Sequence, residues 1–195
     1  MKPLTRRFYS RPTLQVAHDL IGRVLVGESE EGTVAGRIVE VEAYGGEDDP
    51  GSHAFRGRTR RNSTMFGPPG YLYVYFTYGM HYCANLVCER DGVPGAVLLR
   101  AVEPTEGLDL MAVRRGSGDP RLLARGPARL CEAFGIDTSL DGADLAEGPV
   151  WIRGRRRVRG IVGTTPRVGV KVGHELAWRV YEEGSWASPS PRLPR

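Results

Sequence analysis

Two glutamates within an apolar segment are the residues of this chain best suited to chemistry. The segment reads RIVEVEAY over residues 37–44 and contains Glu40 and Glu42. Strict alternation along a strand would place both acids on the face of Ile38 and Tyr44, with apolar residues on the other face. Such a pattern indicates either a solvent-exposed face or a polar site, and for an isolated pair of acids the exposed face is the simpler interpretation.

Neighbouring residues favour a functional role for Glu42. Arg100 lies in the apolar segment AVLLRAV, where a half-buried guanidinium needs a carboxylate or phosphate partner. Glu42 also lies near the end of its segment, with Tyr44 one pleat further on, just before a long loop begins. A carboxylate kept ionised by an arginine can orient and deprotonate a water molecule. The sequence therefore predicts Glu42 as a general base, and on spacing alone Glu40 remains an alternative.

A row of tyrosines suggests recognition of a flat ligand. Tyr71, Tyr73 and Tyr75 alternate, so they share one face of a predicted strand. With nearby arginines such a row can form a stacking platform for bases, although a half-exposed strand face has the same pattern. The opposite face is expected in the core: Leu72, Val74 and Phe76.

Tyr78 stands at the turn that follows this strand, just before Gly79 and Met80. A ring at the tip of a hairpin has little to pack against. It can act as a wedge in a base stack, or it can fold back on its own hairpin. The spacing leaves both interpretations open.

Short elements must position these side chains. Apolar periodicity and turn residues predict helices over residues 14–21, 106–115 and 127–134, the first after the cap Ser10-Arg-Pro12, the second capped by Thr105 and the third closed by Gly135. They predict strands over 23–27, 33–44, 71–77, 81–88, 94–103, 150–158 and 167–172. Residues 45–69 form a long polar loop that carries His53, and such loops are often functional.

Runs of strands with few helices indicate an α+β fold with a mainly antiparallel sheet. The length of 195 residues suits one domain, residues 1–195, and the tail from about residue 185 has little to bury it. The net charge of +4 suits a polyanionic partner. However, nearly all of the positive charge is arginine, a bias that genome composition can also produce.

Several functional classes lack support in the sequence. Cys83, Cys88 and Cys131 are odd in number and irregular in spacing, which indicates free thiols in a reducing cytoplasm rather than disulfides. No clustered histidines, cysteines or acids indicate a metal site, and no phosphate-binding or nucleotide-binding fingerprint occurs. No apolar run suggests a signal peptide or a membrane span. We therefore expect no metal, no cofactor, no membrane partner and a cytoplasmic location.

Taken together, these motifs resemble the alkyladenine (3-methyladenine) DNA glycosylase family. The family pattern of E-A-Y-x-G, a histidine in the next loop, R-N, M-F, P-G-x-L-Y-V-Y-x-x-Y-G-M, an asparagine and L-L-R occurs here in order. The similarity runs from about Ile38 to Leu110 and resumes in the segments GPARLCEAFGI and RVGV. It therefore covers most of the chain, and its specificity comes from the ordered combination of motifs.

The resemblance implies roles for individual residues. Glu42 matches the general base that activates the water attacking the sugar C1′, and Arg100 matches the residue that helps to hold that water and the carboxylate. Three residues match the pocket that encloses a flipped-out base: Tyr44, His53 and Tyr75. His53 would also donate a hydrogen bond to the base edge. No catalytic role is assigned after Arg100.

The resemblance also implies how DNA is bound. Tyr78 matches the side chain that fills the gap in the duplex, with Met80 beside it, and Asn85 matches a pocket residue that disfavours guanine. The implied fold is one mixed domain around a curved antiparallel sheet with a protruding β-hairpin. The implied partner is double-stranded DNA containing damaged purines, and we expect a monomer. An arginine-rich turn at residues 153–159 is expected to add salt sensitivity to DNA binding.

The expected reaction is hydrolysis of the N-glycosidic bond of damaged purines, with 3-methyladenine, hypoxanthine and ethenoadenine as the substrate class. Because no lysine lies in the matched segments, we expect no Schiff-base lyase step and an abasic site as product. Two alternatives are a non-catalytic protein that grips single-stranded nucleic acid with its tyrosine row, and a hydrolase of free nucleosides. A binding protein would have no use for Glu42, and a nucleoside hydrolase would not need Tyr78.

Overall fold

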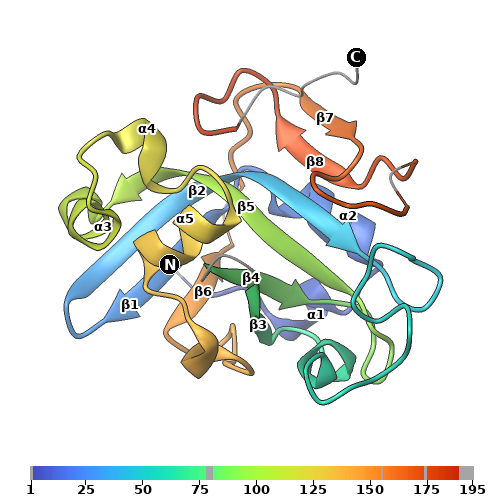
Figure 1. The fold of residues 1–195 in the computed structure, drawn as a ribbon. Coiled ribbons are helices and arrows are strands. Elements are labelled where there is room, and N and C mark those ends of the chain that lie inside the picture. Colours follow the sequence, from blue (N-terminus) through green and yellow to red (C-terminus); the bar gives the residue numbers. More distant parts are fainter. Residues whose placement is uncertain (1, 78–80, 155, 174, 189–195) are drawn as a thin grey trace.

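The computed structural model describes residues 2–77, 81–154, 156–173 and 175–188 of the chain. Among them, eight strands form one antiparallel sheet, which curls like half of a barrel (Figure 1). Its main path runs β3–β4–β5–β2–β1–β6, and β8 pairs with both β2 and β7. The strands are β1 (Val24–Ser29), β2 (Gly32–Tyr44), β3 (Leu72–Thr77), β4 (His81–Val87), β5 (Ala96–Glu106), β6 (Val150–Arg153), β7 (Val162–Thr165) and β8 (Arg179–Glu182). The α+β prediction with a curved antiparallel sheet is confirmed.

Strand β2 lies at the centre of the sheet and pairs with β1, β5 and β8. Its register with β5 shifts around Glu40, and this irregularity reverses the alternation of its side chains. Ile38 therefore joins Val41 in the main core, whereas Val39 packs with Ala101 and Ala187 on the other side. The predicted common face of Ile38 with the two glutamates is wrong for this reason.

Helices close the two sides of the sheet. The structure has α1 (Arg6–Tyr9), α2 (Thr13–Leu20), α3 (Leu108–Arg115), α4 (Pro120–Leu123) and α5 (Pro127–Phe134), with 3-10 turns at Ser63–Phe66 and Thr138–Leu140. Helix α2 packs against β2 and β5, and α5 packs against β4 and β5. Their apolar faces join one continuous core, in which burying a large side chain such as Leu20 contributes about 1.5–3 kcal/mol.

The helix ends explain why these helices start and stop where they do. Pro12, rather than Ser10, is the N-cap residue of α2, and the Thr13 amide donates to the distant Glu89 carboxylate. The predicted cap Thr105 is wrong, because it remains in β5 and donates its hydroxyl to the Ala35 carbonyl; Gly107 precedes α3 instead. These contacts come from outside the local sequence, which is why the local pattern misplaced them.

The C-terminal third differs from its predicted elements. Residues 167–172 form a loop instead of a strand, and β6 ends at Arg153. Strands β7 and β8 were not predicted, because each has four residues and exists through pairing with a distant partner. Within the tail, Ala187 and Ser188 are buried, and Ser188 donates a hydrogen bond to Glu40, whereas Trp186 is 41% exposed.

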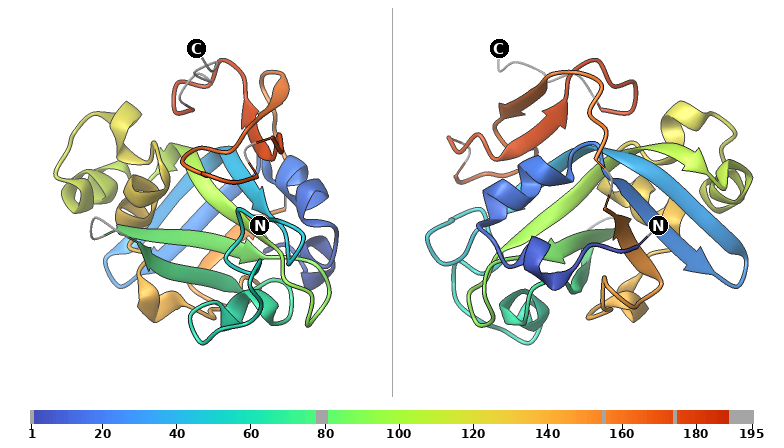
Figure 2. Two further views of the ribbon diagram at one scale, coloured as in Figure 1. Left: turned by 45° about the vertical axis from the view of Figure 1, so that its right-hand side comes forward. Right: turned by 180° about the vertical axis from the view of Figure 1, so that it is seen from behind.

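Strands β3 and β4 form the predicted hairpin, seen towards the left in the left-hand view of Figure 2. Tyr78 and Met80, predicted to enter DNA, lie outside the described residues. Phe76 lies near the C-terminal end of β3 and is 44% exposed, so the prediction that it belongs to the core is wrong. No helix among the described residues is long and apolar enough for a membrane span.

The arginine-rich turn packs against the start of the chain. Arg156 donates from its guanidinium to the carbonyls of Ile21 and His18, at the end of α2. A cation here complements the carbonyl end of a helix. None of the described residues of this turn lines the large cavity described below.

Candidate active site

The Glu42 carboxylate is fully buried and held from three directions. Its Oε2 accepts a 2.8 Å hydrogen bond from the Tyr44 hydroxyl and lies 3.1 Å from Arg100 Nη1. Its Oε1 accepts a 2.7 Å hydrogen bond from the Val168 amide. A carboxylate has about four acceptor positions, so these partners leave one on Oε1 for a further donor. The solvent-exposed interpretation of this acid is excluded, because its exposure is 0%.

Arg100 joins the two glutamates of β2. Its Nε donates to Glu40 Oε1 at 2.7 Å while Nη1 faces Glu42. Burial lowers the pKa of Arg100, but attraction to Glu42 and Glu40 outweighs this effect, so the net pKa is raised and the guanidinium stays charged. The sequence argument that this arginine needs a carboxylate partner is therefore confirmed, with two partners in place of one.

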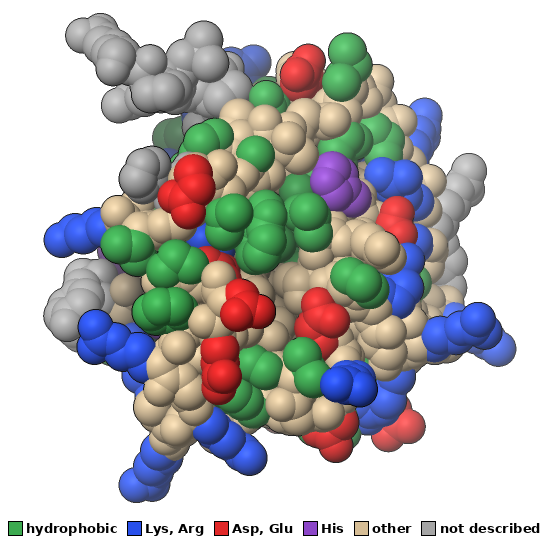
Figure 3. Space-filling model, turned by 90° about the vertical axis from the view of Figure 1, so that its right-hand side faces the viewer, with side chains coloured by type: hydrophobic (Ala, Val, Ile, Leu, Met, Phe, Trp, Pro, Cys, Tyr) green, Lys and Arg blue, Asp and Glu red, His purple; other side chains and the backbone are tan. Residues whose placement is uncertain are grey.

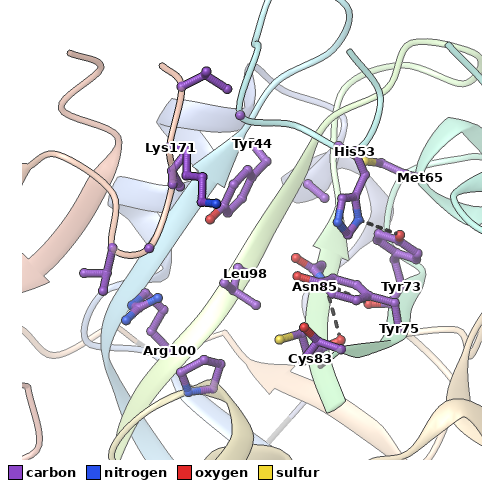
Figure 4. A pocket seen from close by; sticks show the side chains of 18 of the residues that line it. Tyr44, His53, Met65, Tyr73, Tyr75, Cys83, Asn85, Leu98, Arg100 and Lys171 are labelled. Carbon is purple, nitrogen blue, oxygen red and sulfur yellow. Dashed lines mark hydrogen bonds between the residues drawn. The ribbon is translucent and has the colours of Figure 1, made fainter. Parts of the chain in front are cut away.

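A cavity of about 420 Å³ opens beside this cluster. Figure 4 shows Tyr44 on one side of it and His53, Tyr73 and Tyr75 on the other, with Leu98 between them. This volume is typical of small-molecule sites. Glu42 itself does not line the cavity. Its three partners do, so the carboxylate lies directly behind the wall that they form.

The aromatic wall is held together by ring contacts. The His53 ring meets the Tyr75 ring edge to face at 4.5 Å between centroids, and Tyr73 lies 5.4 Å from Tyr75. Such aromatic pairs stabilise a fixed geometry as well as burying area. Tyr71 does not belong to this wall, because it stacks with Arg6 at the start of β3. The predicted tyrosine row is therefore not a continuous platform.

His53 is arranged as a neutral hydrogen-bonding group. Its Nδ1 lies 3.1 Å from the Tyr73 hydroxyl. Burial raises the pKa of Tyr73 to about 12, so the phenol keeps its proton and can donate to Nδ1. Burial, and then the positive charge of Arg61, lower the pKa of His53. With Nδ1 accepting, Nε2 is left as the donor of the neutral ring.

Asn85 and Cys83 complete the wall on β4. The Asn85 amide nitrogen donates to the Tyr73 carbonyl at 3.1 Å, which fixes the orientation of its side chain. Cys83 is nearly buried, and burial raises the pKa of its thiol, so it is a poor nucleophile. Both residues line the cavity, and of the two the sequence analysis singled out Asn85 as a pocket residue.

The loop at residues 167–172 forms the remaining wall, which the sequence analysis did not foresee. Arg167 is fully buried and makes two hydrogen bonds to Asp49, of 2.6 and 2.7 Å. Its guanidinium also lies 4.7 Å from the Tyr44 ring centre. This ion pair ties the C-terminal loop to the loop that follows β2, so both cavity walls are fixed to one another. The RVGV motif was the sequence signal that could have located this wall.

Lys171 lies on this same loop and lines the cavity, and Figure 4 shows it on the side of Tyr44. Lys171 makes neither a hydrogen bond nor an ion pair with any described residue, and no Asp or Glu is among the described residues that line the cavity. Lys171 directly follows the matched RVGV segment, so an amine lies at the cavity wall although no matched segment contains a lysine. The abasic product therefore stays a prediction.

Another face of the molecule has a different character. In Figure 3 hydrophobic and acidic side chains occupy the middle of one face, and basic side chains stand mainly towards its edges. A second hollow is lined by Leu14 and Trp178 together with the acids Glu47, Asp48 and Glu89. Acidic walls repel phosphates, so this hollow does not suit a DNA backbone. Within the described residues, no group of three potential ligands could hold a metal.

Comparison with known proteins places the chain among enzymes. It is 48% identical to a protein of Chlorobaculum parvum over 99% of this chain and 93% of that protein, and 48% identical to one of Methanocella arvoryzae over 95% and 94%. It is 58% identical to one of Streptomyces avermitilis over 73% and 67%. The names of all three assign them provisionally to the 3-methyladenine DNA glycosylases.

These matches, which span nearly the whole chain, define the protein as a DNA glycosylase, a hydrolase of N-glycosidic bonds. The family model of the methylpurine-DNA glycosylases matches residues 7–186. The chain belongs to the methylpurine-DNA glycosylase family.

Proposed function

We propose that this protein removes damaged purines of the 3-methyladenine, hypoxanthine and ethenoadenine class from duplex DNA. The observation that carries the proposal is the buried Glu42 carboxylate held by Arg100, Tyr44 and Val168 behind the wall of an aromatic cavity. A base must leave the duplex to enter such a cavity. There, Tyr44 on one side and the rings of His53 and Tyr75 on the other would enclose its two faces.

Glu42 is the general base of the proposed reaction. A water molecule at the free acceptor position of Oε1, between Arg100 and Val168, gives its proton to the carboxylate as its oxygen bonds to C1′. The C1′–N bond breaks, and its electrons leave with the base. The sugar develops oxocarbenium character, which the nearby carboxylate stabilises. A methylated purine that is already cationic leaves as a neutral molecule.

The cavity favours electron-poor rings. Tyrosine faces attract cations, so a positively charged alkylated purine gains from stacking between them. The neutral His53 ring would offer its Nε2 proton to an acceptor on the edge of the base. Asn85, fixed by the Tyr73 carbonyl, would disfavour guanine through the exocyclic amine of that base.

Duplex binding is proposed to depend on Tyr78, with Met80 beside it, as a wedge that fills the gap left by the flipped nucleotide. Replacement of Tyr78 by Ser should weaken capture of a lesion in duplex DNA more than base release from single strands. Measurement of both substrates with the same lesion tests this. Equal losses on the two substrates would argue against a wedge.

The decisive experiment is Glu42→Gln. Loss of a general base costs about 100- to 10,000-fold in rate. We expect single-turnover release of hypoxanthine, ethenoadenine and 3-methyladenine to fall by such a factor, while binding to lesion-containing duplex is retained. Full activity in this variant would refute Glu42 as the base. The single-strand-binding alternative has less support, because Tyr73 is only 2% exposed and Tyr71 lies apart.

A further inference from the structure

A second buried glutamate shares the catalytic arginine. Glu40 is 1% exposed, and its Oε1 accepts hydrogen bonds of 2.7 Å from the Nε atoms of both Arg100 and Arg179. Its Oε2 accepts a 3.1 Å hydrogen bond from the Ser188 hydroxyl. Glu40 does not line the cavity, and of its partners only Arg100 does, whereas all three partners of Glu42 line it. The role of Glu40 as an alternative general base is therefore not supported.

The strand register explains why Arg100 reaches both acids. Glu40 pairs with Ala101 and Val41 pairs with Leu99, which leaves Arg100 as the extra residue of β5 at this step. An extra residue of this kind redirects its side chain and bends the strand. The bulge alone does not fix the position of a side chain as long as that of arginine. Glu40 holds the Nε of Arg100, which leaves Nη1 of Arg100 facing Glu42.

We infer that Glu40 is a positioning residue for the reaction, and that it couples the C-terminal segment to the catalytic pair. This inference rests on the proposed roles of Glu42 and Arg100. Two carboxylates and two guanidiniums balance their charges in this buried cluster. Without Glu40, the Nε of the buried Arg100 loses its partner, and a buried charge without its partner is costly. Arg100 then shifts, and Glu42 loses part of the contact that holds its carboxylate in place.

The chain contains a matched control for this inference. Glu103 is also buried, accepts from two guanidiniums, Arg37 and Arg159, and takes a hydrogen bond from Ser185. Its cluster has the same composition as that of Glu40, but none of its members lines the cavity or contacts Glu42. Loss of Glu103 therefore reports the structural cost of breaking such a cluster.

The test compares Glu40→Gln with Glu103→Gln in single-turnover base release from duplex DNA containing hypoxanthine. We expect Glu40→Gln to lower the rate by about 10- to 100-fold, as for residues that orient a reacting group. Lesion binding should be retained, because Glu40 does not line the cavity, so the loss should fall on the rate and not on the affinity. Glu103→Gln should keep both the rate and the affinity at temperatures where it is folded.

A milder pair of substitutions tests the inference if the Glu40→Gln variant does not fold. Ser188→Ala removes one neutral donor from Glu40, and Ser185→Ala removes one from Glu103. We expect a reduction of about fivefold in the rate for Ser188→Ala, the cost of one hydrogen bond, with lesion affinity retained. Ser185→Ala should leave both unchanged.

The outcomes separate this inference from the proposed function. If Glu42→Gln is inactive but Glu40→Gln and Ser188→Ala keep the wild-type rate, positioning by Glu40 is refuted and the proposed function stands. Equal losses in the Glu40 and Glu103 variants would also refute it, because the effect would be structural. Base release by Glu42→Gln at the wild-type rate would refute the proposed function itself.

Discussion

The Glu42 carboxylate lies 3.1 Å from the Arg100 guanidinium, with the acid fully buried and the arginine 11% exposed. Burial of this pair keeps bulk water away from the acid, yet Arg100 reaches the wall of the aromatic cavity. A fixed charge pair in a dry site acts more strongly than it would in water. This arrangement suits the general-base role that we propose for Glu42.

The Tyr44 hydroxyl is expected to contribute to this base through its hydrogen bond to Glu42. Burial, and then the negative charge of Glu42, raise the pKa of Tyr44, so the phenol remains a donor. Tyr44→Phe keeps the stacking ring and removes one hydrogen bond to a charged group, worth about 1.5–3 kcal/mol. Single-turnover release should fall by about 10- to 100-fold, with lesion affinity retained. Tyr75→Phe, whose hydroxyl interacts with Cys83 instead, should have a smaller effect. Equal effects would contradict this role.

The Asp49–Arg167 pair should matter for stability as well as for the cavity. Burial raises the pKa of Asp49, but hydrogen bonds from Arg167 and from backbone amides outweigh it and leave the pKa low. Asp49→Asn leaves the buried guanidinium without its counter-charge, which costs about 3–5 kcal/mol of unfolding free energy. Denaturant unfolding measures this.

An exposed ion pair is the control. Glu132 pairs with Arg115 at the surface, so Glu132→Gln should cost at most about 1 kcal/mol. Because the pKa of Asp49 is lowered in the folded state, its contribution is present above its ordinary pKa of about 4 and is lost as the pH falls through the lower folded value. An Asp49→Asn protein as stable as Glu132→Gln would contradict the anchoring role.

His53 should make the protein less stable in mild acid. Its pKa is lowered in the folded state, so the unfolded chain takes up a proton near pH 6.5 while the folded protein does not. Stability then falls as the pH drops below about 6.5, until the folded ring also protonates. His53→Gln should show a smaller decrease in melting temperature between about pH 7.5 and about pH 5.5. An identical decrease in both proteins would show that this ring is not perturbed.

Lys171 is expected to contact the phosphate backbone beside a flipped nucleotide, because its ammonium has no partner among the described residues and lies on the cavity wall. Lys171→Ala should reduce the slope of log affinity against log salt by about 0.9, the value for one phosphate contact. Lys2→Ala, which removes the other lysine far from the cavity wall, is the control. An unchanged slope with an altered preference between cationic and neutral lesions would instead place the ammonium against the base.

Much of the fold follows from local pattern. Period-two alternation located β2, β3 and β4, and helical spacing with Gly135 located α5. These elements carry strong apolar periodicity, so their own residues determine them. The four-residue strands β7 and β8 have no such signal: β8 depends on pairing with β2, and β7 depends on pairing with β8. Local reasoning therefore failed mainly in the C-terminal third.

The candidate site divides in the same way. The acids, the arginine and the aromatic residues were recognisable from their types and order, because those types are required for base catalysis and stacking. The Val168 amide on Glu42, across 126 positions of the chain, was not recognisable, because backbone groups leave no trace in side-chain patterns.

By itself, the sequence determined the chemistry that is available: which side chains can ionise, stack or donate, and in which strands they occur. Only the tertiary structure decided their partners. The register shift between β2 and β5 turned Arg100 towards both glutamates, and the loop after β7 closed over Glu42. The reason is physical, since the charge state and direction of a buried group depend on neighbours that only chain packing brings within hydrogen-bonding distance.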